Sequence, residues 1–258
     1  MRAFKIGLKL WSTNLQYIAP AQELHARGVF DYLELFTVPG SLETISQWKE
    51  LEIPYVLHAP HTYAGLNPSD YLRRDDNLKL VEQVACFVDA LNPAYVIFHP
   101  GVGGDFCETI AQFNLIGKKF LRVSAKVLIE NKPKRGLKGE NCLGASVAEV
   151  RQVLAETGFG FCLDFGHAIC ASVSLGLSWR GMIEDFIALK PVMFHLSDGD
   201  YSEQDCHDHF GTGQFDLPGI IRHVHSGAMV SVETKKDFSD QLDDFVSDAQ
   251  FLKRLMVS

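Results

Sequence analysis

Short runs of aliphatic, β-branched and aromatic residues recur along the 258-residue chain at a nearly even spacing. Each run has the length of an ordinary strand. The eight runs cover residues 5–10, 32–36, 55–59, 95–99, 127–131, 161–165, 193–197 and 229–233. From the first run to the last, seven intervals cover 224 positions, a mean of 32. We therefore predict eight strands, each followed by enough chain for a helix.

The segments between these runs have a helical pattern. In residues 76–91 the apolar side chains recur near a period of 3.6 residues, and we predict further helices over 105–124, 146–157 and 238–256. Strands that alternate with helices run parallel and are joined by crossover helices. An open doubly wound sheet is the alternative, but no G-x-G-x-x-G follows the first run. The pattern predicts an α/β protein: one (β/α)₈ TIM-barrel domain over residues 1–258.

Composition and net charge bear on the partners and the cellular compartment of the protein. The net charge of −8 and the pI near 5.7 argue against an overall basic surface for nucleic acid. No stretch approaches the roughly 20 apolar residues that span a bilayer, and the N-terminal apolar run is too short for a signal peptide. The six cysteines form no C-x-x-C pair, and most lie in apolar segments. We expect a cytoplasmic protein with reduced thiols and no membrane partner.

Polar side chains follow the predicted strands where each strand ends. In a (β/α)₈ barrel these ends meet at one rim, where active sites lie. Five histidines and four carboxylates occupy them: His58, His99, Glu130, Asp164, His167, His195, Asp205, His207 and Glu233. Any one of these histidines alone is more often a hydrogen-bonded structural residue, and a lone Asp is often a helix cap. On strand three, His61 is an alternative to His58, which we prefer because it ends the strand.

The joint pattern of these nine residues is more informative. Four converging carboxylates repel one another in a low dielectric, so they must keep protons or hold cations. Imidazole and carboxylate together are preferred ligands of Zn²⁺, Mn²⁺ and Fe²⁺. Three divalent ions would leave an excess charge of +2, which suits a phosphate. One ion would leave the site negative, which suits a neutral sugar.

The segment LDFGH, residues 163–167, places a carboxylate and an imidazole three positions apart. On a straight strand Asp164 and His167 would face opposite sides of the sheet. We expect Gly166 to turn the chain so that both can reach one pocket, although they need not share an ion.

Seven short motifs, taken together, resemble the endonuclease IV branch (AP endonuclease family 2) of the xylose isomerase-like TIM barrels. They are HAP at 58–60, FHPG at 98–101, IEN at 129–131, LDFGHA at 163–168, HLSD at 195–198, DCH with GTG within 205–213, and VET at 232–234. Each motif alone is weak. All seven occur in the family's order, over nearly the whole chain.

The resemblance implies a trinuclear metal centre, with three Zn²⁺ ions favoured and Mn²⁺ or Fe²⁺ possible. By motif, His58, His99 and Glu130 would hold one ion. Glu130 would bridge to a second ion, which is also held by the set Asp164, His195 and Glu233. A third ion would be held by the set His167, Asp205 and His207.

The resemblance also implies a reaction. The family hydrolyses phosphodiesters at abasic sites in DNA, a DNA repair activity in which a metal-bridging hydroxide attacks phosphorus. The implied partner is DNA with abasic sites or a phosphorylated small molecule. Glu130 would help to orient the nucleophile, and we take Glu130 and Glu233 as the catalytic residues.

The chain departs from the family at three places outside the predicted ligands. Cys206 stands where the family has an Arg, KPKRGLKGE replaces a small Gly-rich segment after Asn131, and GVFDYLELFTVPG resembles the sugar isomerase branch. The basic residues of the loop after strand five could hold phosphates, although a solvated loop is the commoner case. They are Lys132, Lys134, Arg135 and Lys138. The same caution applies to Arg73 and Arg74.

A metal-dependent sugar isomerase or epimerase is the alternative function. It needs one ion and only four of the nine residues: Glu130, Asp164, His195 and Glu233. The two glutamates would then act as acid and base on a hydroxyketone. A barrel that binds metal or ligand without catalysis is a third possibility. The sequence leaves the metal, the substrate and the oligomeric state open.

Overall fold

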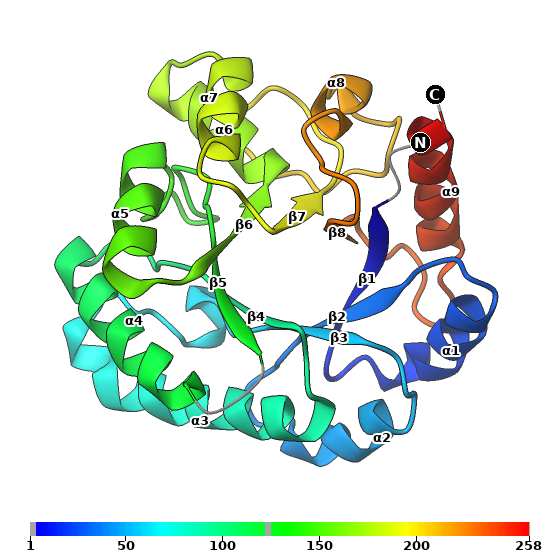
Figure 1. The fold of residues 1–258 in the computed structure, drawn as a ribbon, viewed down its shortest axis with the longest axis horizontal. Coiled ribbons are helices and arrows are strands. Elements are labelled where there is room, and N and C mark those ends of the chain that lie inside the picture. The colour runs from blue at the N-terminus through cyan, green and yellow to red at the C-terminus, as the bar shows by residue number, and fades with distance from the viewer. Residues whose placement is uncertain (1–3, 122–124, 258) are drawn as a thin grey trace.

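The computed structural model describes residues 4–121 and 125–257. Eight parallel strands pair in chain order, and β8 pairs with β1, so the sheet closes into a barrel with helices around it (Figure 1). The strands are β1 Lys5–Trp11, β2 Tyr32–Phe36, β3 Tyr55–His58, β4 Tyr95–Phe98, β5 Lys126–Glu130, β6 Gly160–Asp164, β7 Met193–Leu196 and β8 Met229–Val232. The predicted (β/α)₈ barrel is confirmed, and each strand lies within one residue of its predicted start and end.

Helices connect successive strands on the outside of the barrel. They are α1 Ile18–Ala26, α2 Ile45–Lys49, α3 Arg74–Leu91, α4 Phe106–Phe120, α5 Val147–Thr157, α6 Phe165–Leu175, α7 Trp179–Ile187, α8 Leu217–Ile221 and α9 Asp243–Val257. Residues 122–124 of the predicted 105–124 helix lie outside the described residues. The predicted 238–256 helix begins only at Asp243, since the preceding segment has no regular structure, bends at residues 239–240, and has its Phe238 carbonyl engaged by the Tyr17 hydroxyl.

Several helices begin where the sequence supplies a capping side chain. Ser146 and Glu149 form a capping box at the start of α5, in which each side chain accepts a hydrogen bond from the backbone N–H of the other residue. Asp105 caps α4 and Asp216 caps α8 in the simpler one-sided way. These caps fix where each strand-to-helix loop ends, and loops of this kind carry part of the candidate site.

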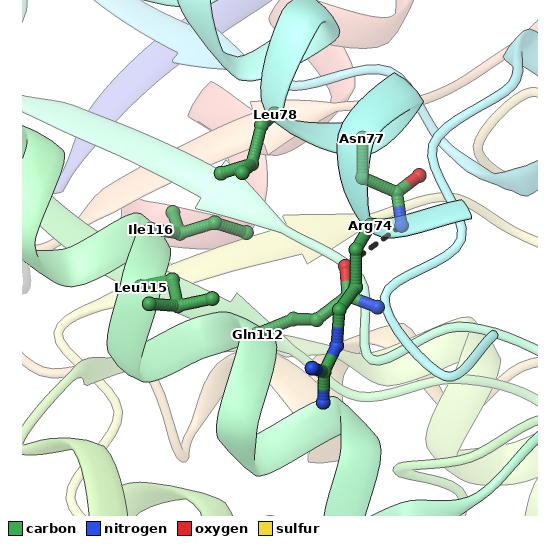
Figure 2. Close-up of a pocket in the computed structure, with 6 residues that line it drawn as sticks. All are labelled: Arg74, Asn77, Leu78, Gln112, Leu115 and Ile116. Carbon is green, nitrogen blue, oxygen red and sulfur yellow. Dashed lines mark hydrogen bonds between the residues drawn. The ribbon is translucent and has the colours of Figure 1, made fainter. Parts of the chain in front are cut away.

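Figure 2 shows side chains between α3 and α4, in the helical layer outside the barrel. Asn77 of α3 donates a hydrogen bond to Gln112 of α4 at 2.8 Å, and Arg74 forms a two-pronged ion pair with Glu108. Arg74 does not line the cleft at the barrel mouth. The Arg74 guanidinium therefore serves packing between α3 and α4.

The interior of the barrel is built in layers, because alternate residues of each strand point inward. One layer is apolar and contains Tyr32, Val56, Ile97, Leu128, Cys162 and Met193. Gly7 of β1 leaves room for the Tyr32 ring, since a Cβ at residue 7 would lie 2.3 Å from that ring. This layer closes the floor of the barrel below the candidate site.

The described helices include none with the length and apolarity needed to cross a membrane.

Candidate metal centre

The candidate site is the polar layer directly above the apolar one. Two residues further along each of the strands β2 to β7, the inward side chain changes to a carboxylate or an imidazole. The residues at this level are Glu34, His58, His99, Glu130, Asp164 and His195. Because these side chains stand on the strands or just beyond their ends, the barrel itself brings them together. All six are buried, so their charges interact in a low dielectric.

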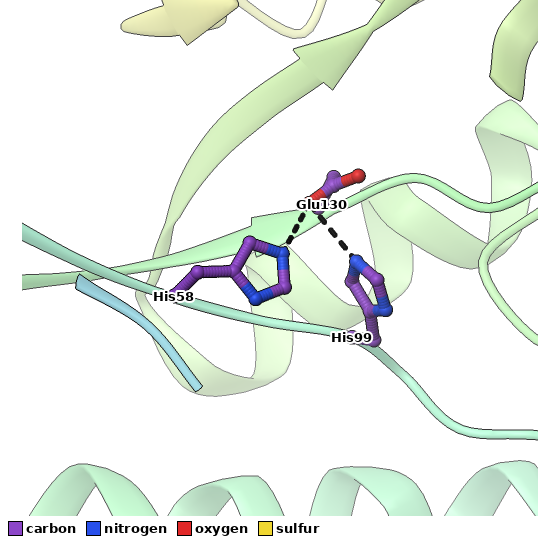
Figure 3. Close-up of side chains that lie close together, drawn as sticks. All are labelled: His58, His99 and Glu130. Atoms are coloured by element: carbon purple, nitrogen blue, oxygen red, sulfur yellow. Dashed lines mark hydrogen bonds and ion pairs between the residues drawn. The ribbon is translucent and has the colours of Figure 1, made fainter. Parts of the chain in front are cut away.

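His58, His99 and Glu130 form the first group. Both imidazole Nε2 atoms contact the same carboxylate oxygen, Glu130 Oε2, at 3.0 Å and 2.9 Å. Figure 3 shows the two rings converging on Glu130 from β3 and from the end of β4. The ligand atoms of this group lie within 4.8 Å of one another, close enough to share one metal ion.

Glu130, Asp164, His195 and Glu233 form the second group, within the same 4.8 Å limit. His195 lies at its centre: Nδ1 is 2.6 Å from Glu233 Oε1, 3.3 Å from Glu130 Oε2 and 4.0 Å from Asp164 Oδ2. Glu130 thus belongs to both groups, as expected of a residue that bridges two ions.

His167, Asp205 and His207 form the third group. The Nε2 atoms of the two histidines lie 3.2 Å and 2.7 Å from Asp205 Oδ2. His207 has a φ of +52°, in the left-handed region that non-glycine residues rarely adopt. This backbone turns its ring toward Asp205, and such strain is found most often at functional sites. The structure therefore brings together all nine predicted residues in the predicted three sets, while their role as metal ligands stays a prediction.

Asp164 and His167 reach their positions differently from what the spacing suggested. α6 begins directly after Asp164, whose Oδ1 caps it by accepting the His167 N–H at 2.6 Å. Gly166 is helical and not among the residues with positive φ, so the turn expected at this glycine is wrong. A Cβ at Gly166 would lie 3.3 Å from Asp164 Oδ1 and 3.4 Å from Ser197 Oγ, so a larger residue would require these side chains to shift slightly.

The positions of the imidazole protons show why the three groups need positive charge between their ligand atoms. A carbonyl oxygen only accepts hydrogen bonds, so a ring nitrogen bonded to one must carry the proton. Nδ1 of His58 bonds to Ala59 O at 2.8 Å, Nδ1 of His167 to Asn131 O at 2.9 Å, and Nδ1 of His207 to Glu233 O at 2.7 Å. In the neutral ring each Nε2 then directs a lone pair at a carboxylate oxygen. That contact is repulsive unless a proton or a metal ion lies between the two atoms.

The pKa shifts of residues in the three groups agree with this need for positive charge. Burial opposes ionisation of Glu130, but His99 and His195 hold the pKa of its carboxyl well below the usual value. Burial likewise lowers the pKa of His207, yet Asp205 outweighs it and raises that pKa to about 9. For Asp164 burial dominates and raises the pKa to about 6. Positive charge at the imidazoles stabilises the carboxylates, and divalent ions can supply it in place of protons.

Two further residues of the site, the buried Glu34 and the partly buried Lys9, were missed from the sequence. Glu34 of β2 accepts a hydrogen bond from His195 Nε2 at 2.9 Å, and Lys9 of β1 lies 3.1 Å from Glu34 while also pairing with Glu233. Glu34 therefore fixes the His195 tautomer and leaves Nδ1 for a metal. The signal was present, because a Glu in the middle of the run YLELF is costly to bury unless it is paired.

His61 does not belong to any of the three groups. It lies beside the site, with its ring 5.0 Å from Phe36, and burial lowers the pKa of its imidazole to about 4. The geometry thus favours His58 over His61 as the strand-three ligand.

A cleft of about 1240 Å³ opens above the three groups. It exceeds the roughly 300–1,000 Å³ of an ordinary small-ligand site. Residues of all three groups line it, together with Lys132 and Arg135 from the loop after β5 and Trp11 from the end of β1. Lys134 and Lys138 of the same basic loop are not among the lining residues. The predicted contact of this loop with the site is therefore made by Lys132 and Arg135.

Comparisons with known proteins agree with this architecture. A family model described as "Xylose isomerase-like TIM barrel" matches residues 22–255. The probable endonuclease 4 of Mycobacterium leprae is 25% identical over 203 residues, which span 73% of this chain and 76% of that protein.

Two solved structures superpose on nearly the whole chain. A D-tagatose 3-epimerase-like protein does so with a TM-score of 0.76 at 20% identity, covering 98% of this chain and 97% of its own. Endonuclease IV of Thermus thermophilus does so with a TM-score of 0.69 at 17% identity, covering 98% and 99%. At these identities the superpositions establish the fold alone. With the family match, they confirm the resemblance that the motifs indicated.

Proposed function

The chain belongs to the xylose isomerase-like TIM barrel family, and we propose that it is a metal-dependent phosphoester hydrolase that works with three divalent ions. The observation that carries the proposal is the third group, His167, Asp205 and His207. A one-ion isomerase has no need of it. The relatives named probable endonuclease 4 add support. The proposed substrates are DNA with abasic sites or a smaller phosphate ester, and the cytoplasmic location stays a prediction.

The donor set fits Zn²⁺, since five imidazoles accompany four carboxylates. When bound, such ions would lower the pKa of a water molecule and offset the charge on the attacking and leaving oxygens. Glu130 would organise the site, because its Oε2 contacts three imidazoles and its Oε1 lies 3.1 Å from His167. Glu233 would fix His195 from one side and His207, through its carbonyl, from the other.

The second candidate is a sugar isomerase or epimerase. The observation that favours it is the completeness of the second group, in which two glutamates flank His195 and Glu34 and Lys9 pair with these residues. One ion there, with Glu130 and Glu233 as acid and base, would suffice for proton transfer next to a carbonyl. It leaves His58, His99 and the third group without a task.

Two assays separate the candidates. The first measures cleavage of bis(p-nitrophenyl) phosphate and incision of a duplex with one abasic site, in Zn²⁺ or Mn²⁺. The second measures interconversion of ketohexoses in Mn²⁺ or Co²⁺. We expect phosphoester cleavage without ketohexose conversion. Ketohexose conversion without cleavage of either phosphodiester would overturn the proposal.

A further inference from the structure

Two of the loops that line the cleft carry opposite charge. The loop after β5, residues 131–146, carries four Lys or Arg side chains and one carboxylate. The loop after β7, residues 197–216, carries six carboxylates and no Lys or Arg. A duplex lying over the cleft would have to place its phosphates on both loops, and the acidic loop repels them. A ligand with a single phosphate group can use the basic loop alone.

Backbone hydrogen bonds hold the basic loop in place, both within the loop and to the neighbouring loop after β4. Within it, the N–H of Gly136 donates to the Glu140 carbonyl at 2.9 Å, and that of Cys142 to the Lys134 carbonyl at 3.0 Å. Hydrogen bonds from Leu143 N to Gly101 O and from Gly103 N to Asn141 O tie it to the loop after β4. The Tyr63 hydroxyl binds Glu140 from the loop after β3. These contacts fix the basic loop as one wall of the cleft.

Lys132 and Arg135 differ from Lys9 and Lys235, which also line the cleft, whereas the Lys236 ammonium donates a hydrogen bond to the Thr234 carbonyl at 2.7 Å. Lys9 pairs with Glu34 and Glu233, and Lys235 pairs with Asp208 at 3.0 Å. Within residues 4–121 and 125–257, no carboxylate lies within ion-pair distance of Lys132 or Arg135. Two cations that line a cleft and have no carboxylate partner among the described residues can pair with an anionic ligand.

Lys132 also lies beside the first metal group, with Nζ 3.4 Å from His99 Nδ1. Nδ1 can accept from an ammonium only while Nε2 carries the ring proton. An imidazole that ligates metal through Nε2 has its proton on Nδ1 and cannot accept there. Metal binding to His99 would thus free the ammonium for an anion placed over the metals.

The opposite wall offers a flat apolar face. Trp11 is 54% exposed, its ring lies 5.6 Å from that of Phe36, and both line the cleft. Asn14 and Thr62 also line the cleft and offer hydrogen bonds to hydroxyl groups. An aromatic ring in a cleft that also carries polar side chains suits the mixed apolar and hydroxylated faces of a sugar ring.

We propose that the substrate is a small phosphorylated sugar, whose phosphate is held by Lys132 and Arg135 and whose ring packs on Trp11. This inference rests on the proposed phosphoester hydrolase and narrows its substrate class. It assigns Lys132 and Arg135 to phosphate specificity, and it excludes duplex DNA as the preferred substrate.

Calorimetric titration of the metal-loaded protein with ribose 5-phosphate, ribose and inorganic phosphate tests this directly. We expect ribose 5-phosphate to bind at least about tenfold more tightly than either fragment, because phosphate and sugar sites act together. Lys132→Ala and Arg135→Ala should each weaken its binding about tenfold, the usual worth of a charge-assisted hydrogen bond. Trp11→Ala should remove the advantage over inorganic phosphate. Lys134→Ala, in the same loop but outside the cleft lining, should change binding less than about twofold.

Unchanged affinity for ribose 5-phosphate in both Lys132→Ala and Arg135→Ala would overturn the inference. So would tighter binding of an abasic-site duplex than of ribose 5-phosphate, although phosphoester hydrolysis would then still stand. Binding through Lys132 without cleavage of any phosphate ester would uphold the sugar phosphate site and refute the hydrolase.

Discussion

The second and third metal groups differ in how the fold supports them. The second is built from strand ends: its carboxylates are almost fully enclosed, and Glu34 and Lys9 support it from β2 and β1. The third depends on the first turn of α6 and on a loop where His207 has a strained backbone and a 33% exposed side chain. The second group is thus part of the barrel interior, whereas the third is added at its mouth. Changes in the second should affect stability and activity, and changes in the third activity alone.

Glu130→Gln should have the largest effect, because this carboxylate belongs to two groups and contacts four imidazoles. We expect kcat/KM to fall by roughly 10³-fold or more for whichever substrate is turned over. Metal content should fall with it. The measurement pairs steady-state kinetics with metal analysis, and near-normal turnover would remove Glu130 from the centre of the account.

His207→Ala should reduce phosphoester cleavage by about 100-fold while the Tm of the metal-free protein changes by less than about 2 °C, because the side chain is partly exposed. His209→Ala is the matched control, since it lies two residues further on and outside the three metal groups. It should keep activity within about threefold. Equal losses in both variants would indicate a general disturbance of the loop.

Glu34→Gln tests whether Glu34 holds His195 of the second group in place. The glutamine keeps the size of the side chain but removes the charge that holds the His195 proton on Nε2 and partners Lys9. We expect Zn²⁺ affinity to fall about 10- to 100-fold, as is typical when a partner of a ligating histidine is lost. Competition with a chelating dye measures it. An unchanged affinity would mean that His195 needs no support from Glu34.

Chelation should lower the Tm of the wild-type protein, because bound ions stabilise the native state in which the carboxylates converge. Readdition of Zn²⁺ should restore the Tm. The shift should be much smaller in Glu130→Gln than in the wild-type protein. It should be larger in His207→Ala than in Glu130→Gln, because His207→Ala damages only the third group. Scanning calorimetry with and without chelator measures these shifts. A Tm insensitive to chelation would contradict the metal centre.

Of these changes, Arg74→Gln should have the smallest effect on activity and stability, since Arg74 lies in the helical layer outside the barrel. Hydrogen bonds from Arg74 lower the pKa of Glu108, so the folded-state pKa lies below the unfolded value. The stabilisation is then present above the unfolded pKa of about 4.3 and is lost as the pH falls through the folded pKa. We expect a small drop in Tm at pH 7 that disappears in acid. Thermal melts at both pH values check it, and a change in catalytic rate would contradict the assignment to packing.

Much of this architecture could be predicted from the sequence because the barrel has a simple period. The strands β2 to β7 carry His, Asp or Glu at the polar layer, so the positions of Glu130, Asp164 and His195 follow from the strand pattern. Their grouping with Glu233, which lies just beyond β8, followed from the resemblance. The grouping of His167, Asp205 and His207 likewise followed from the resemblance, and nothing local predicts the left-handed φ of His207. The cap that Asp164 provides for α6 is the helix-cap role that the sequence offered for a lone Asp. Glu34 was missed because only strand ends were inspected, and its partner Lys9 is remote in sequence.

The number of metal ions per chain tests the central claim most directly. Protein purified with Zn²⁺ in slight excess and then freed of loosely bound metal should carry close to three ions per chain by plasma mass spectrometry. His207→Ala should carry close to two. One ion per chain in the wild-type protein, unchanged in His207→Ala, would contradict the trinuclear centre and favour the isomerase.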